Sequence, residues 1–424
     1  MTRQEYPRLS EAVSRRTLSN GLEVFVVHKP YHARHYAFFA THYGGMDLRF
    51  RSGGIWKDTP AGIAHYLEHK MFDTENDTAT RELALNGAVE NAFTASDMTA
   101  YYFECTEKFY ENLRVLLSFV TVPYFTPESV EKEQGIIAQE IRMSDDDPEW
   151  RIYQNLLCCL YYSSPVRTPV VGTLESISHI TPQTLYDCHK AFYTPDNMVL
   201  ICIGSMDIDR VCEITEELIP RDSGTAAEHD RGTVEDQTPA TAEVEMEMEI
   251  SMPMFLTGYK CAVPPMGEAI LRENIIGNMA CDILFGDSSP LYNRLYEEGH
   301  INGSLGGSFD ILPGAALLYV GGDARDPHYV SGEITQEAAR LARDGIDEEF
   351  YQQIRRATYG QMLRSLNSFE DIAISIADGH FRGFDYYSFP DIFDSVTKED
   401  IEDFLRRNIT AEHSAISIIR PTGA

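Results

Sequence analysis

The sequence predicts an α+β protein made of two repeated halves, each a largely antiparallel sheet backed by helices. Three observations favour this class. The chain has 424 residues, which is too long for one ordinary hydrophobic core. A weak internal repeat recurs three times at a single offset. In the first half, strands enclose a run of helices, which is an order typical of α+β folds.

The repeat becomes visible when the sequence is shifted by 216 residues. Three segments then align in order and without local gaps: 38–43 with 254–259, 99–103 with 315–319, and 180–201 with 396–417. A single match of this kind can arise by chance. The same offset in three separate places indicates a duplicated architecture.

The elements of the first half follow from hydrophobic periodicity and from helix-start signals. Apolar runs predict strands at Glu23–His28, Tyr36–Tyr43 and, at the end, Met198–Gly204. Helical stretches lie between them, at 60–72, 78–86, 107–121, 127–144, 149–161 and 181–192. Thr59-Pro60 has the form of an N-cap followed by proline at the first helical position, and Thr126-Pro127 begins a later helix in the same way.

A polar segment separates the halves. Residues 221–242 are rich in Asp, Glu, Thr, Gly and Pro, which predicts a solvated acidic linker between a first domain at 1–220 and a second domain at 243–424. Directly after it, glutamates at 243, 245, 247 and 249 alternate with apolar residues. Period two predicts a strand with one wet face, which is characteristic of antiparallel sheet.

Composition excludes several classes of function. The net charge is −31, from 35 Lys and Arg against 66 Asp and Glu, so we expect no binding of nucleic acid or of anionic membranes. The charge has two interpretations: solubility through self-repulsion, or an acidic cavity that attracts basic peptides. Residues 1–7 lack the apolar centre of a signal peptide, and no apolar run reaches 18 residues. We therefore expect a soluble cytoplasmic protein whose eight scattered cysteines are reduced and mostly buried.

The segment His65-Tyr66-Leu67-Glu68-His69 carries the clearest chemistry. On a helix, His65 and His69 lie one turn apart on one face, where two imidazoles can bind one zinc ion. Glu68 borders that face, from which a carboxylate can take a proton from metal-bound water. This is the H-x-x-E-H order of the inverzincin metallopeptidases. The alternative is a pair of helical histidines satisfied by hydrogen bonds on a partly buried face.

A site with two histidine ligands needs a third protein ligand, and Glu140 is the candidate. On the helix that begins at Thr126-Pro127, Glu133 and Glu140 share a face with Ile136 and Met143. Carboxylates in an apolar stripe are costly to bury unless they are paired or bound to metal. The two lie about 10 Å apart along the helix axis, so we expect one to bind the ion and the other to support a ligand. The alternative is two solvated surface glutamates.

A third motif lies between these two in the sequence, Asn91-Ala92-Phe93-Thr94 followed by Thr99-Ala100-Tyr101-Tyr102. The three motifs, in this order, resemble the pitrilysin, insulysin and mitochondrial processing peptidase family, in its half-size bacterial form. The resemblance implies that Asn91, Ala92, Phe93 and Thr94 form an edge strand that pairs with extended peptide.

The same resemblance assigns roles to the metal-site residues. It implies one zinc ion per chain, with His65, His69 and Glu140 as ligands. Glu68 is then the general base and Glu133 a supporting carboxylate.

The second half lacks the zinc motif. At the offset of 216, Cys281–Phe285 occupies its place, so one metal site is expected. Many family members carry an Arg and a Tyr in this half that hold the substrate carbonyl. Here Tyr296 and Asn302 stand at those positions, and Arg294 is two residues out of register. Gly303–Gly307 is predicted to be a turn or a strand connection.

The resemblance therefore predicts a zinc metalloendopeptidase that hydrolyses extended or unfolded peptides as the metal-bearing subunit of a dimeric clamshell. Single-chain relatives contain four repeats and this sequence contains two, so a second half-size subunit is expected. A heterodimer is favoured because a different partner would bring the Arg and the Tyr; a homodimer is the other possibility. The competing hypothesis is a catalytically weak peptide-binding or scaffolding subunit, but the intact His and Glu residues favour the enzyme.

Overall fold

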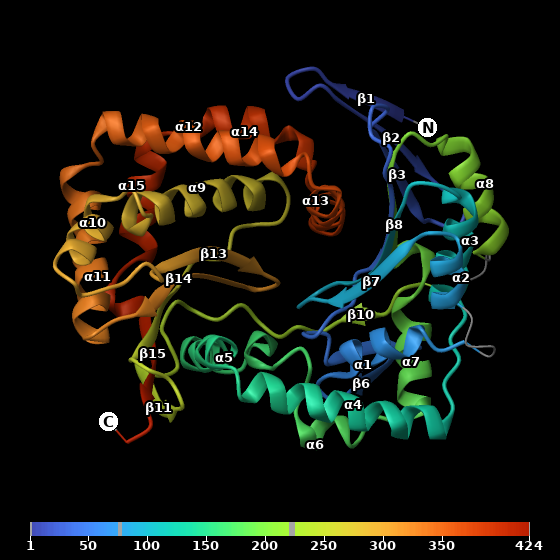
Figure 1. Ribbon diagram of the computed structural model, residues 1–424, viewed down its shortest axis with the longest axis horizontal. Helices are drawn as coiled ribbons and strands as arrows, with labels where there is room; N and C mark the ends of the chain where they lie inside the picture. Colours follow the sequence, from blue (N-terminus) through green and yellow to red (C-terminus); the bar gives the residue numbers. More distant parts are fainter. Residues whose placement is uncertain (1, 75–78, 220–224, 424) are drawn as a thin grey trace. The chain divides into compact units, whose positions relative to one another are not determined.

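The computed structural model describes residues 2–74, 79–219 and 225–423. The chain forms two compact units (Figure 1). Unit 1 comprises Met1–Ile141, Thr168–Arg231 and Ser365–Phe381, and unit 2 comprises Arg142–Arg167, Gly232–Arg364 and Arg382–Ala424. The predicted α+β class is confirmed, because each unit has one main sheet backed by helices. The predicted domain boundary at 220 and 221, and position 78 of the predicted helix 78–86, lie outside the described residues.

Unit 1 is built on a seven-stranded sheet in the order β1-β2-β3-β9-β4-β8-β7. Neighbouring strands are antiparallel except β3 and β9, which are parallel. The strands are β1 (Thr2–Tyr6), β2 (Glu11–Thr17), β3 (Glu23–His28), β4 (His35–Thr41), β7 (Val89–Thr94), β8 (Thr99–Cys105) and β9 (Met198–Gly204). β9 is buried along its whole length, which accounts for its unbroken apolar sequence. A smaller sheet, β10-β5-β6, contains β5 (Arg49–Ser52), β6 (Ile55–Asp58) and β10 (Glu228–His229).

Helices cover both faces of the main sheet of unit 1. In Figure 1, α2 (Ala79–Leu85), α3 (Phe109–Thr121) and α8 (Ile208–Leu218) lie on one face, and α13 (Phe369–Arg382) lies on the other. The remaining helices are α1 (Ile63–Met71), α4 (Pro127–Asp145, whose end belongs to unit 2), α6 (Leu174–Ile177) and α7 (Pro182–Phe192), with a 3-10 turn at Pro195–Asn197. The predicted helices and strands of this half are thus present within a few residues.

Unit 2 repeats the inner part of this sheet. Its strand order is β11-β15-β12-β14-β13, which matches β3-β9-β4-β8-β7 and keeps the one parallel pair, here β11 with β15. The segments aligned at the offset of 216 fall on equivalent strands, so the predicted repeat is confirmed. The strands are β11 (Glu243–Met248), β12 (Met254–Lys260), β13 (Gly306–Leu312), β14 (Ala315–Asp323) and β15 (Ser414–Pro421).

The helices of unit 2 follow the same plan. They are α5 (Pro148–Leu160), α9 (Glu268–Phe285), α10 (Pro290–Glu297), α11 (Pro327–Asp344), α12 (Glu348–Ser365), α14 (Phe389–Ser395) and α15 (Lys398–Asn408), with 3-10 turns at Pro165–Arg167, Tyr386–Ser388 and Ala411–His413. The alternating segment after the linker is a strand, as predicted, but its expected antiparallel pairing is wrong. β11 is an edge strand parallel to β15, and its wet face comes from its exposed glutamates.

The two halves of the sequence exchange one helix each. α5, from the first half, packs on β12 and β15 of unit 2, where the Tyr161 hydroxyl after it donates to the Ala316 carbonyl at 3.0 Å. α13, from the second half, packs on unit 1, where Lys29 Nζ donates to the Leu366 carbonyl at 2.9 Å and the Phe25 and His380 rings meet edge to face. Each main sheet is therefore covered on one face by a helix from the other half of the chain.

The segment predicted to be a solvated linker is anchored at two places. In unit 1, Arg231 and His229 contact the fully buried carboxylate of Asp47. In unit 2, Glu235 pairs with Lys260 at 2.7 Å, with 8% and 2% of their side chains exposed. The expectation of full solvation is wrong, because polar composition does not reveal that these side chains have buried partners outside the segment, in Asp47 and Lys260.

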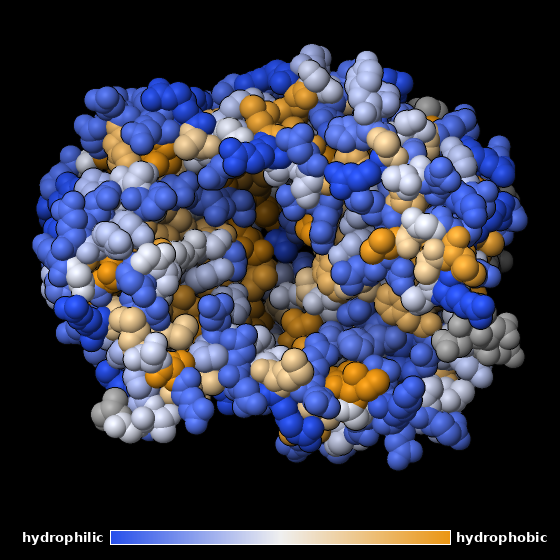
Figure 2. Space-filling view, in the orientation of Figure 1, coloured by the Kyte–Doolittle hydropathy of each residue, from blue (hydrophilic) through white to orange (hydrophobic). Residues whose placement is uncertain are grey.

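The surface and the thiols agree with the composition. Figure 2 shows hydrophilic side chains over most of the visible face, with hydrophobic ones in small scattered groups. All eight cysteines are free thiols, and seven of them are buried. No helix within the described ranges combines the length and the apolar character that crossing a bilayer requires.

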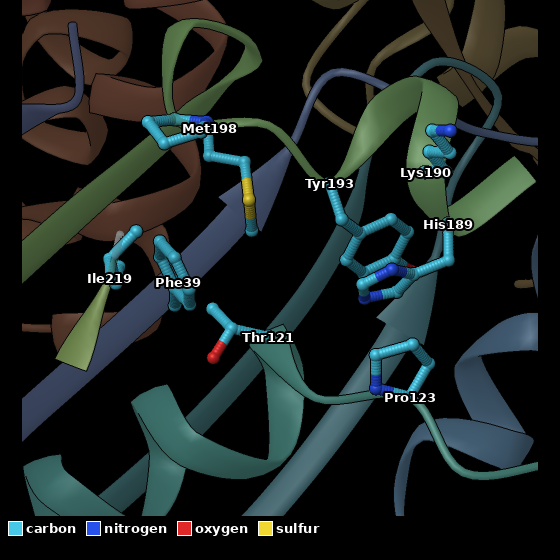
Figure 3. A pocket seen from close by; sticks show the side chains of 9 residues that line it. Phe39, Thr121, Pro123, His189, Lys190, Tyr193, Met198 and Ile219 are labelled. Atoms are coloured by element: carbon cyan, nitrogen blue, oxygen red, sulfur yellow. The ribbon is translucent and has the colours of Figure 1, made fainter. Parts of the chain in front are cut away.

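A cavity of about 250 Å³ opens in unit 1 beside the end of α7 (Figure 3). Its lining is Phe39, Thr121, Pro123, His189, Lys190, Tyr193, Pro195, Met198 and Ile219. The His189 and Tyr193 rings stack with centroids 4.5 Å apart, and His189 Nε2 donates to the Val120 carbonyl at 3.1 Å. Burial lowers the pKa of His189 to about 4, so the imidazole is neutral at pH 7. The lining includes none of the residues predicted to bind zinc.

We predict that Glu235→Gln destabilises the protein by about 3 kcal/mol at pH 7, because it leaves the Lys260 ammonium buried without a counter-charge. The change in the free energy of unfolding is measured by urea denaturation. Asp403→Asn is the matched control: it breaks the exposed pair with Arg406, which is worth about 0.5 kcal/mol. Equal effects of the two substitutions would contradict the prediction.

The same pair gives a pH dependence. Burial raises the pKa of Glu235, but Lys260 and the backbone N–H groups of residues 162–164 outweigh it and hold the pKa at about 2. The pKa of this carboxyl is lower in the folded state than in the unfolded state. The ionised carboxylate therefore stabilises the folded protein fully above the ordinary pKa of 4.5, and this stabilisation is lost as the pH falls toward 2. The stability difference between wild type and Glu235→Gln should therefore narrow below pH 4.5.

Candidate active site

Helix α1 carries the histidine motif and starts later than its sequence predicts. It begins at Ile63 after Gly62, rather than at Thr59-Pro60. Gly62 has φ of 88°, and a Cβ there would lie 2.7 Å from the Val171 carbonyl oxygen, so only glycine fits this close approach. The Thr59 hydroxyl donates instead to the Leu48 carbonyl at 3.1 Å and so does not cap the helix.

Two side chains of α1 join it to α4. The Tyr66 hydroxyl donates to the Val130 carbonyl, and Lys70 Nζ, which is buried, donates to the Ser129 carbonyl at 3.3 Å and to Asp73. α4 starts at Pro127 as predicted, and Thr126 Oγ1 accepts from the Ser129 backbone N–H. These bonds hold the first turn of α4 against α1, and the next turns of α4 then carry its glutamates to the histidines.

His65, His69 and Glu140 form one group of metal-ligating atoms, all within 4.8 Å of one another. His65 Nε2 lies 3.4 Å from Glu140 Oε1, and His69 Nε2 lies 3.7 Å from Glu140 Oε2. Ligand atoms about 2.1 Å from one zinc ion at tetrahedral angles are about 3.4 Å apart. The three side chains therefore have the chemistry and the spacing of a zinc site with one open position. Hydrogen bonding from His65 lowers the pKa of Glu140, so this carboxylate is ionised at pH 7.

Glu133 contacts the other nitrogen of His69. Its Oε1 lies 3.0 Å from His69 Nδ1, and because a carboxylate only accepts, Nδ1 carries the proton. The Nε2 lone pair is then left facing Glu140, which is the tautomer that a metal ligand needs. The hydrogen bond raises the pKa of His69 and lowers that of Glu133. His65 Nδ1 is buried without such a partner in the described part of the chain, so only one of the two imidazoles is oriented in this way.

Glu68 is a buried carboxyl beside the group. Burial raises its pKa, while His65, His69 and a hydrogen bond from the Thr94 hydroxyl, at 3.2 Å, favour the charged form. A carboxylate with a raised pKa and little solvent is suited to accept a proton. The contact from Thr94 was not predicted from the sequence, because α1 and β7 are brought together only by the fold.

The segment Asn91–Thr94 lies on β7, at the end of the main sheet of unit 1. β7 pairs with β8 on one side, in a register that sets Thr94 opposite Thr99. No other described strand pairs with its outer edge. Thr94, the last residue of β7, donates a hydrogen bond to Glu68, so this edge strand lies next to the group formed by His65, His69 and Glu140.

The prediction that Glu133 and Glu140 lie in a buried apolar stripe of α4 is wrong. Ile136 and Met143 are 49% and 68% exposed, so the stripe that contains Glu133 and Glu140 is not part of the core. The core face of α4 is formed by Val130, Ile137 and Ile141. The two glutamates are nevertheless paired, because α1 presents its histidines to this outer face.

Unit 2 has core residues in place of the motif. Cys281, Leu284 and Phe285 are buried in α9. Tyr296 is 56% exposed and stacks on Tyr292, and Arg294 pairs with Glu298 and Glu333.

The Asn302 side chain is also engaged within unit 2. Its Nδ2 donates to Asp323 Oδ2 at 2.8 Å, and its Oδ1 accepts from the backbone N–H of Ser304 at 2.8 Å. The predicted turn is present at Gly303 and Ser304, whereas Gly306 and Gly307 already belong to β13.

Comparisons with known proteins agree with this geometry. Residues 52–174 match the family model described as insulinase (peptidase family M16), and residues 179–358 match the model described as the peptidase M16 inactive domain. YmfH, an uncharacterised zinc protease of Bacillus subtilis (strain 168), is 35% identical over 422 residues, and the match covers 98% of each chain.

Two solved structures extend the comparison. An M16-like peptidase from Alicyclobacillus acidocaldarius is 32% identical, with a TM-score of 0.91 over 97% of this chain and 98% of that one. Pitrilysin shares the fold at 16% identity, with a TM-score of 0.77 over 99% of this chain and 46% of that one. With two family models in order and a relative aligned along nearly the whole chain, the protein belongs to peptidase family M16, the insulinase family.

Proposed function

We propose that the protein is a zinc-dependent endopeptidase that hydrolyses extended or unfolded peptides. The observation that carries the proposal is the carboxylate of Glu140 facing Nε2 of both His65 and His69, at 3.4 and 3.7 Å. Relatives named as zinc proteases support the metal and the reaction class. The residues proposed as ligands are His65, His69 and Glu140.

Each remaining residue has a separate task in this proposal. A bound zinc ion lowers the pKa of a coordinated water and polarises a substrate carbonyl. Glu68 accepts the proton of the attacking water and returns it to the leaving amine, and Thr94 holds its carboxylate in place. Glu133 keeps the His69 proton on Nδ1.

Substrate binding is assigned to the outer edge of β7. An extended peptide that adds to this edge is recruited along Asn91, Ala92, Phe93 and Thr94 by the main-chain groups of the alternate residues that face outward, with little dependence on its sequence. Its scissile bond would then lie near Thr94, which touches Glu68. Folded proteins keep most of their strands paired and blunt or cover their sheet edges, so unfolded chains are the expected substrates.

Glu68→Gln is predicted to abolish hydrolysis of an unstructured fluorogenic peptide while zinc stays near one ion per chain, because the amide keeps the shape but accepts no proton. Glu140→Gln should instead lower the zinc content, because it removes an anionic ligand. Zinc is measured by elemental analysis and hydrolysis by fluorescence. Loss of zinc in Glu68→Gln together with an active, zinc-loaded Glu140→Gln would reverse the two roles.

Glu133→Gln should weaken zinc affinity by about 10- to 100-fold without abolishing binding, because the orientation of His69 is lost but all three ligands remain. Competition with a chromogenic chelator measures the affinity. Ile136→Gln, an exposed change on the same face of α4, is the control and should leave the affinity within twofold. An unchanged affinity in Glu133→Gln would remove its supporting role.

We also propose that a second subunit completes the site, and a different subunit is favoured over a second copy. The residues at the two carbonyl-holding positions do not replace the usual pair: Asn302 is bound to Asp323 and Ser304, and Tyr296 is stacked on Tyr292. Each missing donor at a developing oxyanion costs about 10²–10³ in rate. The purified chain should therefore be slow, and co-expression with an M16 partner that carries the Arg and Tyr should raise kcat. Vigorous hydrolysis by a monomer, unchanged by any partner, would contradict this.

A further inference from the structure

Residues 227–231, here termed the strap, are bound to unit 1 along their whole length. The Ala227 backbone N–H donates to the Ala191 carbonyl at 3.0 Å, and that of Asp230 donates to the Arg49 carbonyl at 2.9 Å. Between them, β10 pairs with β5, with Glu228 opposite Arg51. The strap is therefore the third strand of the sheet that contains the β5–β6 hairpin.

The strap also provides the hydrogen-bond and charge partners of Asp47, which are His229 and the guanidinium of Arg231. The Asp47 side chain is fully buried, and its Oδ1 accepts from His229 Nδ1 and from Arg231 Nε, both at 2.7 Å. Arg231 Nη2 donates to Oδ2 at 3.1 Å, so the guanidinium binds both oxygens. The backbone N–H of Gly44 donates to the same oxygen at 2.8 Å. A buried carboxylate requires such partners, so the loop 44–47 depends on the strap for its conformation.

The loop 44–47 in turn supports the turn that follows β7. Backbone N–H groups of Gly45 and Met46 donate to the carbonyls of Ala95 and Ser96, at 2.9 and 2.8 Å. A Cβ on Gly44 would lie 2.5 Å from the Ala95 carbonyl oxygen, so the two segments are in direct contact. Thr94, the residue before this turn, donates to Glu68.

A second route leads from the strap to α1. The β5–β6 hairpin, which the strap extends, runs directly into the residues before α1. There the backbone N–H of Thr59 donates to the Leu48 carbonyl at 2.8 Å. Gly45 lies against Val170, and the next residue, Val171, packs on Gly62 at the start of α1. Asp47 and the hairpin thus support both elements that hold Glu68, which are β7 and α1.

We propose that the strap is a positioning element of the active site, with Arg231 and His229 as positioning residues that act through Asp47 on Thr94 and α1. The proposal rests on the proposed function, since it assigns a task to Thr94 and Glu68. A purely structural role is the alternative: loss of the strap would then lower stability without a specific effect on turnover.

The test compares Arg231→Ala and Arg231→Lys with Glu11→Gln in the full-length chain. Lysine keeps the charge but cannot bind both oxygens of Asp47. Glu11→Gln is the matched control, because it breaks another buried ion pair of unit 1, between Glu11 on β2 and Lys29 directly after β3, away from β7. Thermal unfolding, zinc content, kcat, KM and amide hydrogen exchange are measured for each variant.

Arg231→Ala is expected to keep its zinc and its KM within twofold, to lose at least tenfold in kcat, and to exchange amides at 44–47 and 95–98 at least tenfold faster. Small displacements of catalytic groups suffice for such losses. Arg231→Lys should show the same changes to a smaller extent. This variant still tests the proposal if Arg231→Ala does not fold. In a Thr94→Ala background, Arg231→Ala should cost less in kcat than in wild type, because the route through Thr94 is already broken.

Two results would overturn the proposal. One is unchanged exchange at 95–98 in both Arg231 variants; the other is a fall in kcat that Glu11→Gln reproduces at the same loss of thermal stability. If wild type shows no zinc-dependent hydrolysis even when it is co-expressed with an M16 partner that carries the Arg and the Tyr, the proposed function fails instead. The exchange measurement still decides whether the strap holds the segment 95–98, since it does not depend on activity.

Discussion

The hydrogen bond from the Tyr66 hydroxyl to the Val130 carbonyl joins α1 to α4 inside the core of unit 1, and the site depends on this junction. The buried Lys70 reinforces it through the Ser129 carbonyl. Because both contacts are made to the first turn of α4, the rigid helix then determines where Glu133 and Glu140 lie. Glu133 contacts Nδ1 of His69, and Glu140 faces Nε2 of both histidines. The two glutamates reach different atoms because seven residues, or about 10 Å along the helix axis, separate them.

The described residues contain two such sheets but one such group of metal-ligating side chains, which a duplication followed by divergence explains. The strand order and the single parallel pair are the same in both units, and each sheet is covered by a helix from the other half of the sequence. In unit 2 the place of the motif on α9 is taken by Cys281, Leu284 and Phe285, which fill the core. The fold is therefore maintained by strand pairing and packing that do not require the metal-site residues.

The sequence predicts most of the fold, and its errors have physical causes. The i, i+4 histidines and the seven-residue spacing of the glutamates could be interpreted because helix geometry alone fixes their relations. The predicted start of α1 at Thr59-Pro60 is wrong, because the helix begins after Gly62, where Val171 approaches closely, and the sequence does not reveal this tertiary contact. The alternation of glutamates and apolar residues in β11 indicates a strand with one solvent-exposed face, but it does not indicate that the neighbouring strand, β15, is parallel. Composition predicts a solvated linker at the strap, because it does not reveal Asp47, about 180 residues away, as the partner of Arg231.

His65, His69 and Glu140 are proposed to hold one zinc ion together. A crystal structure of the purified protein, with anomalous maps calculated on either side of the zinc absorption edge, tests it most directly. One zinc peak per chain is expected, within about 2.0–2.2 Å of Nε2 of both histidines and of a Glu140 oxygen. A zinc-loaded protein whose peak lies elsewhere, or whose ligands include Glu133 in place of Glu140, would contradict it.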